Sequence, residues 1–424
     1  MKAVYHYEYM DSFHVKDFMQ IGEKDFFRDK EPSAFEVKNG VVLPYRKTSD
    51  MTQAAGGILD VQAQFVEASA QHIVGEDIVR GYEPDTIEDS DKHVIYFGAF
   101  HAHWGHFLTE MVTRCWYFCG QIDWEVWHVV YIRKNDTCSR PMEGTYREFL
   151  ELLGVPAHRI IQVEKPTRFA AVMVPEISND PGHWFTNAYV RIFDRIRDAV
   201  GAGLGGYEKV YYTRQKAKGL RDTQIGERGI CKLFKHNGYR IVAPEQLSLR
   251  EQVLILKQCK QMVVVEGTLM HNVLFAESGI HLIIINRVCG ANSYQPFINQ
   301  ARMADVTYVD AHLSFFPVFA GGPFLLYRSE SLLRYAGDNG FRGSGRQENT
   351  FCLHGKLIWY FLRYLDQMTA DCIVRWNLRE KHGDTVLEQY RFYRDRIKNY
   401  DIPLWRKMRK VFYMLIRCIA DHGR

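Results

Sequence analysis

Three histidines and a glutamate lie close together just after residues 94–98, a short apolar run. They are His101, His103, His106 and Glu110. In a helix that begins near His103, His106 and Glu110 are four residues apart and share one face. Imidazole titrates near neutral pH, and a neighbouring carboxylate holds its tautomer and favours its protonated form. These residue types at this spacing therefore indicate a general base, His106, assisted by Glu110.

Two other interpretations of this cluster stay open. Zinc binding would use the same side chains, but the HExxH arrangement and an obvious third ligand are absent from the sequence. A hydrogen-bonded structural network would need no ligand, yet three histidines within six residues are unusual for packing alone. We therefore favour the functional interpretation and expect no metal.

A second candidate is a basic segment that follows residues 210–212, another short apolar run. Its side chains Arg214, Lys218 and Arg221 could converge on a diphosphate, because arginine offers a planar two-point fork and lysine a point charge. The alternative is a solvated basic loop without a ligand, which is the better interpretation of this segment in isolation.

The most informative stretch is the β-branched run at residues 262–265, which passes through Glu266 and Gly267 into an amphipathic segment closed by Gly279. This order predicts a strand, a tight turn and a helix. The first turn of a helix leaves backbone N–H groups unpaired, and a glycine lets an anion approach the backbone closely. Residues 266–272 therefore predict a phosphate site, with an ordinary turn that binds nothing as the alternative.

The elements that must position these residues alternate between strands and helices from about residue 92. Such alternation predicts parallel strands with crossover helices. A glycine-rich linker at residues 202–206 divides them into two series, and a cleft between two α/β units is a usual place for a small-molecule site. The first series has expected strands at 94–98, 127–132, 159–163 and 171–174 and expected helices at 103–119, 143–153 and 187–200. The second has expected strands at 210–212, 239–242, 262–265, 281–285 and 306–309.

The second series predicts a doubly wound sheet, in which the loops after the first and third strands can lie side by side. The basic segment and the turn at residues 266–272 would then face the same anion. Positive side chains and helix N–H groups aimed at one site are what a nucleotide diphosphate requires when it leaves with developing charge.

The predicted fold is α/β with two Rossmann-like domains whose parallel sheets face an interdomain cleft, followed by C-terminal helices. Residues 1–90 form a β-rich region, with an Asn39-Gly40 hairpin signal, that joins the N-terminal domain. The two Rossmann-like domains are expected at residues 91–203 and 207–312, and an aromatic loop and helices at residues 313–424. The last helix, at residues 404–419, is basic and amphipathic, and it would lie either on an anionic membrane or on its own domain.

The composition narrows the class of protein. The chain has 424 residues and a formal net charge of +4, so charge does not suggest a nucleic-acid partner. Its first residues lack an apolar leader segment, and no run approaches the length of a transmembrane helix. Nine cysteines without a CxxC pair fit reduced thiols. We therefore expect a cytoplasmic protein.

The order of these motifs resembles glycosyltransferase family 61. The resemblance covers residues 55–310 and is strongest at residues 209–286. It implies a GT-B-like architecture, an acceptor domain at residues 91–203, a nucleotide-sugar-binding domain at residues 207–312, and inversion at the anomeric carbon. The positions that match the family motifs are Arg214, Glu251, Gln252, Gly267 and Asn272.

The turn at residues 266–272 differs from the turn of the family at three positions. Glu266 stands where the family often has histidine, Thr268 replaces alanine, and Leu269 replaces a second glycine. The carboxylate of Glu266 could instead bind a sugar or acceptor hydroxyl, or His271 could take the role of the missing histidine.

The sequence thus predicts an inverting glycosyltransferase that moves a sugar from a nucleotide donor to a growing glycan, such as a bacterial capsule or lipopolysaccharide. Its partners would be the nucleotide sugar, a glycan or lipid-linked glycan acceptor, and a membrane surface. The alternatives are a pyruvyl transferase-like enzyme acting on polysaccharide and a non-catalytic nucleotide- or glycan-binding module of a membrane-associated complex. The expected base is His106 with Glu110, and the rival base is Glu266. The acceptor would contact His101, His103 and Trp104. The donor would contact Arg214, Lys218, Arg221, Glu251, Gly267, Thr268, His271 and Asn272.

Overall fold

The computed structural model describes residues 2–11, 15–47, 53–134, 140–201, 206–216, 224–313, 322–345, 349, 352–361 and 363–364. Lys218, Arg221, most of the expected linker and the expected helix at residues 404–419 lie outside this part of the chain. The chain divides into two compact units. Unit 1 comprises Met1–Ala217, Arg228–Ala311 and Arg328–Arg346, and unit 2 comprises Lys218–Glu227, His312–Tyr327 and Gln347–Arg424.

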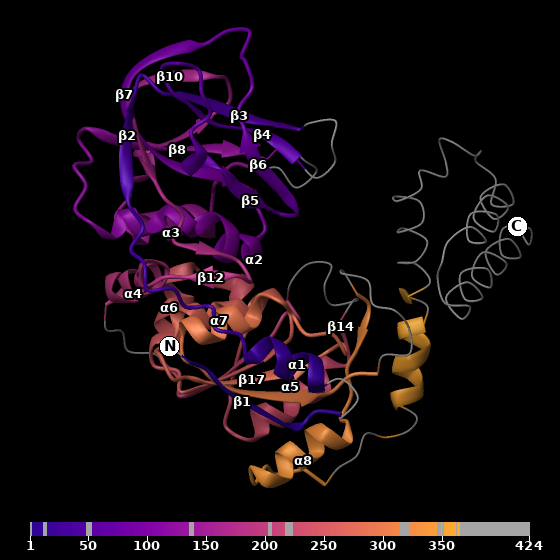
Figure 1. Ribbon diagram of the computed structural model, residues 1–424. Helices are drawn as coiled ribbons and strands as arrows, with labels where there is room; N and C mark the ends of the chain where they lie inside the picture. Colours follow the sequence, from indigo (N-terminus) through magenta and orange to yellow (C-terminus); the bar gives the residue numbers. More distant parts are fainter. Residues whose placement is uncertain are drawn as a thin grey trace, which may run out of the picture. The chain divides into compact units, whose positions relative to one another are not determined.

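The C-terminal half of unit 1 is built on a six-stranded sheet in which every neighbouring pair is parallel (Figure 1). Its strands are β1 (Val4–Tyr9), β13 (Lys209–Tyr212), β15 (Arg240–Val242), β16 (Gln261–Val265), β17 (His281–Asn286) and β18 (Asp305–Asp310). Their order is β1-β18-β17-β16-β13-β15. All five expected strands of the second series are present, and β13 and β16 are direct neighbours. The loops that follow these two strands therefore leave the same edge of the sheet.

Strand β1 shows where local sequence patterns fail. Residues 1–90 were expected to belong with the first series, yet β1 pairs in parallel with β18 at the edge of the second sheet. The rings of Tyr7 and Tyr308 stack with centroids 5.9 Å apart, and Phe18 packs edge-on against Tyr308. This aromatic contact joins residues 301 positions apart in the sequence and fixes β1 on the C-terminal half.

The N-terminal half of unit 1 contains a nine-stranded mixed sheet with the order β5-β6-β4-β3-β10-β7-β8-β9, and β2 pairs with β10. The strands are β2 (Ala34–Lys38), β3 (Val41–Lys47), β4 (Gln53–Leu59), β5 (Gln71–Ile73), β6 (Glu76–Arg80), β7 (Glu88–Phe100), β8 (Trp127–Arg133), β9 (Ile160–Val163) and β10 (Thr167–Pro175). Strands β10, β7, β8 and β9 are parallel, as expected for the first series. The strands of the β-rich region at residues 1–90 join the same sheet with a different pairing, because β2 and β3 run antiparallel to β10 and β4 runs antiparallel to β3.

The Asn39-Gly40 turn does not close the expected hairpin. Asn39 has a φ of 53°, as such a turn requires, but β2 and β3 each pair with β10. The turn therefore passes the chain from one stretch of β10 to the next.

The remaining elements of unit 1 cover the sheets or connect them. The longer helices are α1 (Val15–Gly22), α3 (Thr145–Leu152), α4 (Asn187–Val200), α6 (Leu249–Lys257), α7 (Gln295–Ala301) and α8 (Glu330–Asp338), and α5 (Glu227–His236) begins at the boundary with unit 2. Short pieces are η1 (Glu67–Ser69), η4 (Ala157–Arg159), η5 (Pro244–Gln246), η6 (Thr268–Phe275), β11 (Asn179–Asp180) and β12 (Trp184–Phe185). In unit 2, β14 (Gln224–Ile225) pairs in parallel with β19 (Phe324–Leu325).

The expected helix at residues 103–119 changes its winding twice. It begins as α2 (Trp104–His106), continues as a π-helical turn, η2 (Phe107–Met111), and ends as a 3-10 segment, η3 (Val112–Cys119). Side chains from outside the helix bind its carbonyl groups: Tyr189 donates to Leu108, Asn179 to Thr109 and Gln71 to Glu110. These partners replace regular intrahelical hydrogen bonds, and such breaks in regular winding often mark functional sites.

The two halves of unit 1 are joined by buried contacts as well as by the chain. The Arg302 side chain is 1% exposed, and it donates to the Asp194 carboxylate and to the Leu274 carbonyl, each at 2.6 Å. Asp194 lies on α4 and Leu274 on η6, so this guanidinium bonds to both halves. One hydrophobic cluster contains side chains from both sheets.

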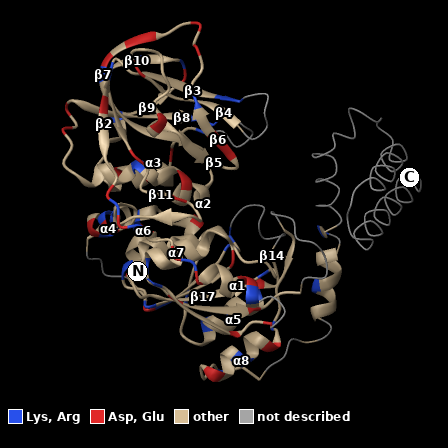
Figure 2. Ribbon diagram, in the orientation of Figure 1, with Lys and Arg blue, Asp and Glu red and all other residues tan. Residues whose placement is uncertain are grey.

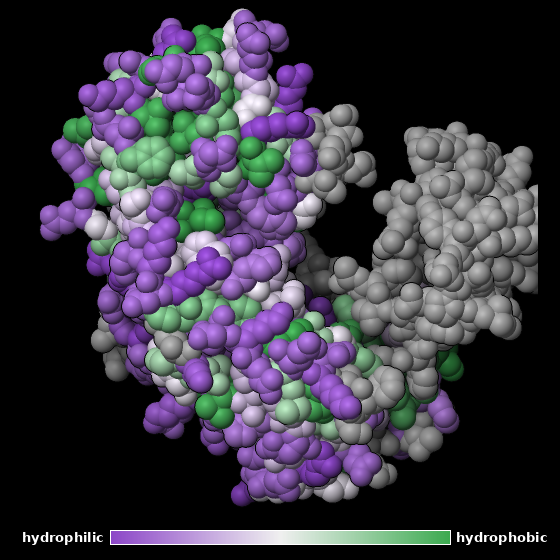
Figure 3. Space-filling view, viewed as in Figure 1, coloured by the Kyte–Doolittle hydropathy of each residue, from purple (hydrophilic) through white to green (hydrophobic). Residues whose placement is uncertain are grey.

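The visible surface of unit 1 is neither of one charge sign nor uniformly apolar. Basic and acidic segments alternate along the ribbon (Figure 2), and apolar side chains are scattered among polar ones on the visible face (Figure 3). Among the described residues, no helix is long and apolar enough to cross a membrane.

Candidate functional site

The carboxyl end of β7 leads directly into the histidine cluster. His103 adopts an extended conformation as the N-cap of α2, and its Nδ1 accepts from the backbone N–H of His106 at 3.5 Å. One helical turn later, the Nδ1 of His106 lies 2.6 Å from Oε1 of Glu110. The expected pair of His106 and Glu110 is therefore formed.

Glu110 is 1% exposed, and burial alone would raise its pKa. Hydrogen bonds from His106 and from the Val74 N–H, which lies 2.7 Å from Oε2, outweigh burial and hold the pKa of Glu110 below its usual value. An ionised carboxylate can only accept hydrogen bonds, so His106 donates through Nδ1 and its Nε2 is the nitrogen that can accept a proton. The His106 side chain is 30% exposed, which leaves a path to this nitrogen.

The turn after β16 brings a second group of side chains to the first. Gly267 has a φ of 132°, a conformation that favours glycine, and η6 starts immediately after it. His271 on η6 is buried, and its Nδ1 lies 2.8 Å from Oε1 of Gln295. Burial and the nearby charges of Arg214, His106 and His103 lower the pKa of His271 to about 4.

The pKa of His103 is also lowered to about 4, by removal of the ring from water and by His106, His101 and Arg214. The ring centroids of His103 and His106 are 4.5 Å apart. Three imidazoles and one guanidinium thus lie around the same turn.

Gly105 permits this close approach of the two halves. A Cβ on Gly105 would lie 2.8 Å from Cγ2 of Thr268 and 3.2 Å from Cδ2 of His271. Any larger residue would push α2 away from the turn.

A directed chain of hydrogen bonds runs alongside this contact. Trp104 donates through its indole Nε1 to Oδ1 of Asn272 at 2.7 Å, and Asn272 donates through Nδ2 to Oε1 of Gln252 at 3.4 Å. Gln252 then donates to the carbonyls of Pro244 and Leu247. Because an indole can only donate, the orientation of both amides is fixed. Asn272 and Gln252, two of the positions that resemble the family motifs, therefore hold the site together.

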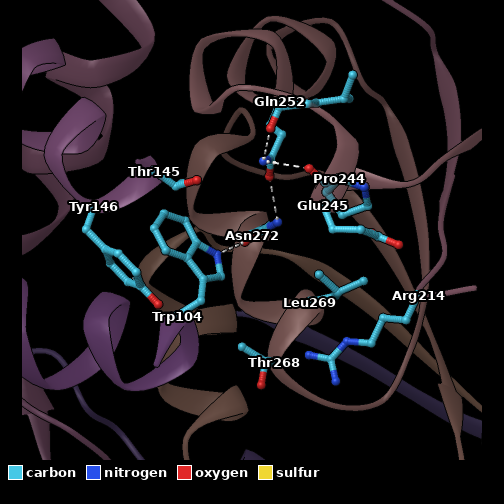
Figure 4. A pocket seen from close by; sticks show the side chains of 11 residues that line it. Trp104, Thr145, Tyr146, Arg214, Pro244, Glu245, Gln252, Thr268, Leu269 and Asn272 are labelled. Atoms are coloured by element: carbon cyan, nitrogen blue, oxygen red, sulfur yellow. Dashed lines mark hydrogen bonds between the residues drawn. The ribbon is translucent and has the colours of Figure 1, made fainter. Parts of the chain in front are cut away.

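These elements enclose a pocket of about 240 Å³ (Figure 4). The Arg214 guanidinium extends towards Thr268, and the Trp104 indole stands on the other side of Leu269 (Figure 4). The pocket is lined by Trp104, Thr145 and Tyr146 from the N-terminal half and by Arg214, Pro244, Glu245, Leu247, Gln252, Thr268, Leu269 and Asn272 from the C-terminal half.

Glu266 is placed away from this pocket's lining. Its side chain is buried at the ends of β16 and β17, and its Oε2 accepts from the backbone N–H of Arg287 at 3.4 Å. Burial raises the pKa of Glu266 to about 7, against the opposing charge of Arg287 and with a further increase from Asp310. The guanidinium of Arg287 lies against Gly267, 3.0 Å from where a Cβ would stand.

Other expected site residues have separate positions. Glu251 completes the capping box of α6 by accepting from the Ser248 backbone N–H, and it does not line the pocket. His101 is buried at the end of β7 and contributes to the electrostatics of His103.

Sequence reasoning missed Glu245, Tyr146 and Arg287. Glu245 follows β15 as Arg214 follows β13, so the rule that places ligands at the carboxyl ends of parallel strands could have found it. Tyr146 gave no local signal, because it reaches the pocket only through the packing of the two halves. Within the described ranges, no group of three or more His, Cys, Asp or Glu side chains could hold a metal ion.

The fold thus places a His-carboxylate pair, His106 and Glu110, on the helix after β7, and a glycine turn after β16 whose Thr268 and Leu269 line the pocket. His106 and Glu110 are not among the residues that line the pocket. Residues 104–301 match the family model Glycosyltransferase 61. This match confirms the resemblance to glycosyltransferase family 61, and the matched domain supports a glycosyltransferase, which acts on a donor and an acceptor. A comparison with curated protein sequences found no match.

Proposed function

We propose that this glycosyltransferase is an inverting, GT-B-like enzyme that transfers a sugar from a nucleotide sugar to a hydroxyl of a growing glycan, such as a bacterial surface polysaccharide. The observation that supports it most is the convergence of His103, His106, His271 and Arg214 on the turn after Gly267. A displacement reaction needs a proton acceptor for the attacking hydroxyl and a positive charge for the leaving group, and these residues supply both.

In the proposed mechanism, Nε2 of His106 takes the proton of the acceptor hydroxyl. The acceptor oxygen then forms a bond to the anomeric carbon as the bond from that carbon to the diphosphate oxygen breaks. A single displacement of this kind inverts the anomeric centre. Glu110 stabilises the imidazolium because its ionised carboxylate lies 2.6 Å from Nδ1.

The leaving diphosphate gains negative charge during this step, and Arg214 and the backbone at Gly267 and Thr268 would stabilise it. Arg287, which lies against Gly267, adds positive charge on another side of the turn. We propose that these groups suffice without a metal ion. Lys218 and Arg221 stay predictions from the sequence.

Calorimetric titration with UDP, GDP and CMP, followed by assays of donor-sugar hydrolysis, tests the proposal. We expect one nucleotide to bind, and Arg214→Ala to weaken it at least about 10-fold, because hydrogen bonds to a charged group are lost. Arg240→Ala removes the same charge near the amino end of β15 and should leave binding unchanged. If none of the three nucleotides binds, the proposed function is wrong.

We further propose a cytoplasmic location with a peripheral membrane contact through residues 404–419, on the basis of the sequence pattern alone. A chain that ends near Asp401 should then sediment less with anionic liposomes than the full chain. Equal sedimentation would remove the membrane contact and leave the transferase proposal standing.

A further inference from the structure

Glu245 occupies a distinctive position in the sheet. The strands β13, β15, β16, β17 and β18 follow one another along the chain, while their spatial order places β15 beside β13 and β13 beside β16. The order along the sheet reverses at β13, and ligands of such sheets bind outside the carboxyl ends of the strands at this point. Arg214 follows β13, Gly267 follows β16 and Glu245 follows β15. A ligand with its phosphates at the first two would therefore extend towards Glu245.

The carboxylate of Glu245 is held in the pocket by the same loop that carries Arg214. The backbone N–H of Lys216 donates to Oε1 of Glu245 at 3.0 Å. A carboxylate has about four acceptor positions, so this bond leaves Oε2 and part of Oε1 for a ligand.

The two charged residues of the pocket lining favour different ligand groups. Among its eleven lining residues, Arg214 is the one cation and Glu245 the one carboxylate. The carboxylate repels phosphate and accepts from hydroxyl groups, whereas the guanidinium does the reverse. The amides of Gln252 and Asn272 are engaged with each other and with Trp104, Pro244 and Leu247. Glu245 is thus the strongest acceptor that the lining presents to a ligand hydroxyl.

We infer that Glu245 binds the ribose hydroxyls of the donor nucleotide, so that the enzyme selects a ribonucleoside diphosphate sugar over its 2′-deoxy counterpart. A vicinal diol can donate two O–H groups to one carboxylate, and a 2′-deoxyribose can donate one. In sheets that bind dinucleotides, an acidic residue near the second strand accepts a hydrogen bond from the ribose hydroxyl of the ligand. The inference rests on the proposed function, because it assumes that the donor is a nucleotide sugar.

Titration of the full chain with UDP and GDP, each beside its 2′-deoxy counterpart, tests this inference. For the nucleotide that binds, we expect the wild-type chain to prefer the ribo form by about 10-fold, the usual effect of one hydrogen bond to a charged group. In Glu245→Ala the affinity for the ribo form should fall to that of the deoxy form, and the ratio should approach one. Glu208→Ala, which removes an exposed carboxylate just before the amino end of β13, should keep the wild-type ratio.

The outcomes separate the two proposals. Equal affinity of the wild-type chain for ribo and deoxy forms, or a preference that survives in Glu245→Ala, overturns the role of Glu245 and leaves the glycosyltransferase proposal standing. If neither UDP nor GDP nor their deoxy forms bind, a nucleoside diphosphate donor is excluded, and this inference falls with it. Circular dichroism of Glu245→Ala identifies a loss of binding caused by misfolding, and in that case Glu245→Lys, which reverses the charge at this exposed position, should also abolish the preference.

Discussion

Two buried glutamates near the site have pKa values shifted in opposite directions. Glu110, on the helix after β7, is 1% exposed, and Glu266, at the end of β16, is 8% exposed. The pKa of Glu110 lies below its usual value, whereas the pKa of Glu266 is raised to about 7. Burial acts in the same direction on both, so the opposite signs reflect their hydrogen-bonding partners and the neighbouring charges.

Glu110 has two close donors, since His106 lies 2.6 Å from one oxygen and the Val74 N–H lies 2.7 Å from the other. Glu266 accepts from the backbone N–H groups of Arg287, at 3.4 Å, and Val288, but together with the charge of Arg287 they do not offset its burial, and the charge of Asp310 acts further against its ionisation. Environments that push two carboxyl pKa values apart assign different roles to the two groups. Glu110 is the ionised partner that a histidine base needs, and the geometry favours His106 over Glu266 as the base.

The largest expected effect is that of His106→Ala. General base catalysis contributes about 10²–10⁴-fold to rate, so the transfer rate with saturating donor should fall by that factor. Nucleotide affinity should change little, because His106 contacts the acceptor in the proposed mechanism. Pre-steady-state transfer assays and nucleotide titration measure the two quantities.

Near-normal turnover of His106→Ala would exclude His106 as the base and leave the enzyme class standing. Glu266→Ala would then be the next variant to assay. If that variant lost the activity, the comparison of the two glutamates would be reversed.

A smaller effect, about 10–100-fold on the transfer rate, is expected for Glu110→Gln. The amide keeps the shape of the side chain and can still accept from His106, but it lacks the negative charge that stabilises the imidazolium. A transfer rate of Glu110→Gln that equals the wild-type rate would show that Glu110 has only a structural role.

Much of the fold was predictable because its signals are local. The β-branched runs at Val263 and Ile283 gave strands, and Gly267 marked the turn. The parallel order of β13 and β16 followed from the alternation of elements, and with it the meeting of Arg214 with the turn.

The features that sequence reasoning did not predict depend on partners far along the chain. The change of winding at residues 104–119 depends on Gln71, Asn179 and Tyr189, and no pattern inside the helix reveals them. The raised pKa of Glu266 depends in the same way on its burial and on the charge of Asp310.

The smallest effect, and the one that tests the comparison without an activity assay, concerns Glu266→Gln. The carboxyl of Glu266 has a pKa of about 7 in the folded protein and a reference value of 4.5. Between these two pH values, the folded protein binds more protons at this group than the unfolded chain does. Its contribution to stability is therefore fully present below about pH 4.5 and is lost as the pH rises towards 7. Glutamine cannot ionise, so the variant should gain stability relative to the wild type over this window.

We expect the variant to gain roughly 2 to 3 kcal/mol relative to the wild type between about pH 5 and about pH 8, since each pKa unit corresponds to about 1.4 kcal/mol. Urea denaturation of both proteins at the two pH values measures this difference, and the pH dependence of all other groups, including His271, cancels in it. Glu110→Gln is the control of opposite sign: its carboxyl has a lowered pKa, so the wild-type residue contributes stability that is lost as the pH falls. A stability difference for Glu266→Gln that stays constant with pH would mean that Glu266 is ionised when folded, and the two buried glutamates would then be alike.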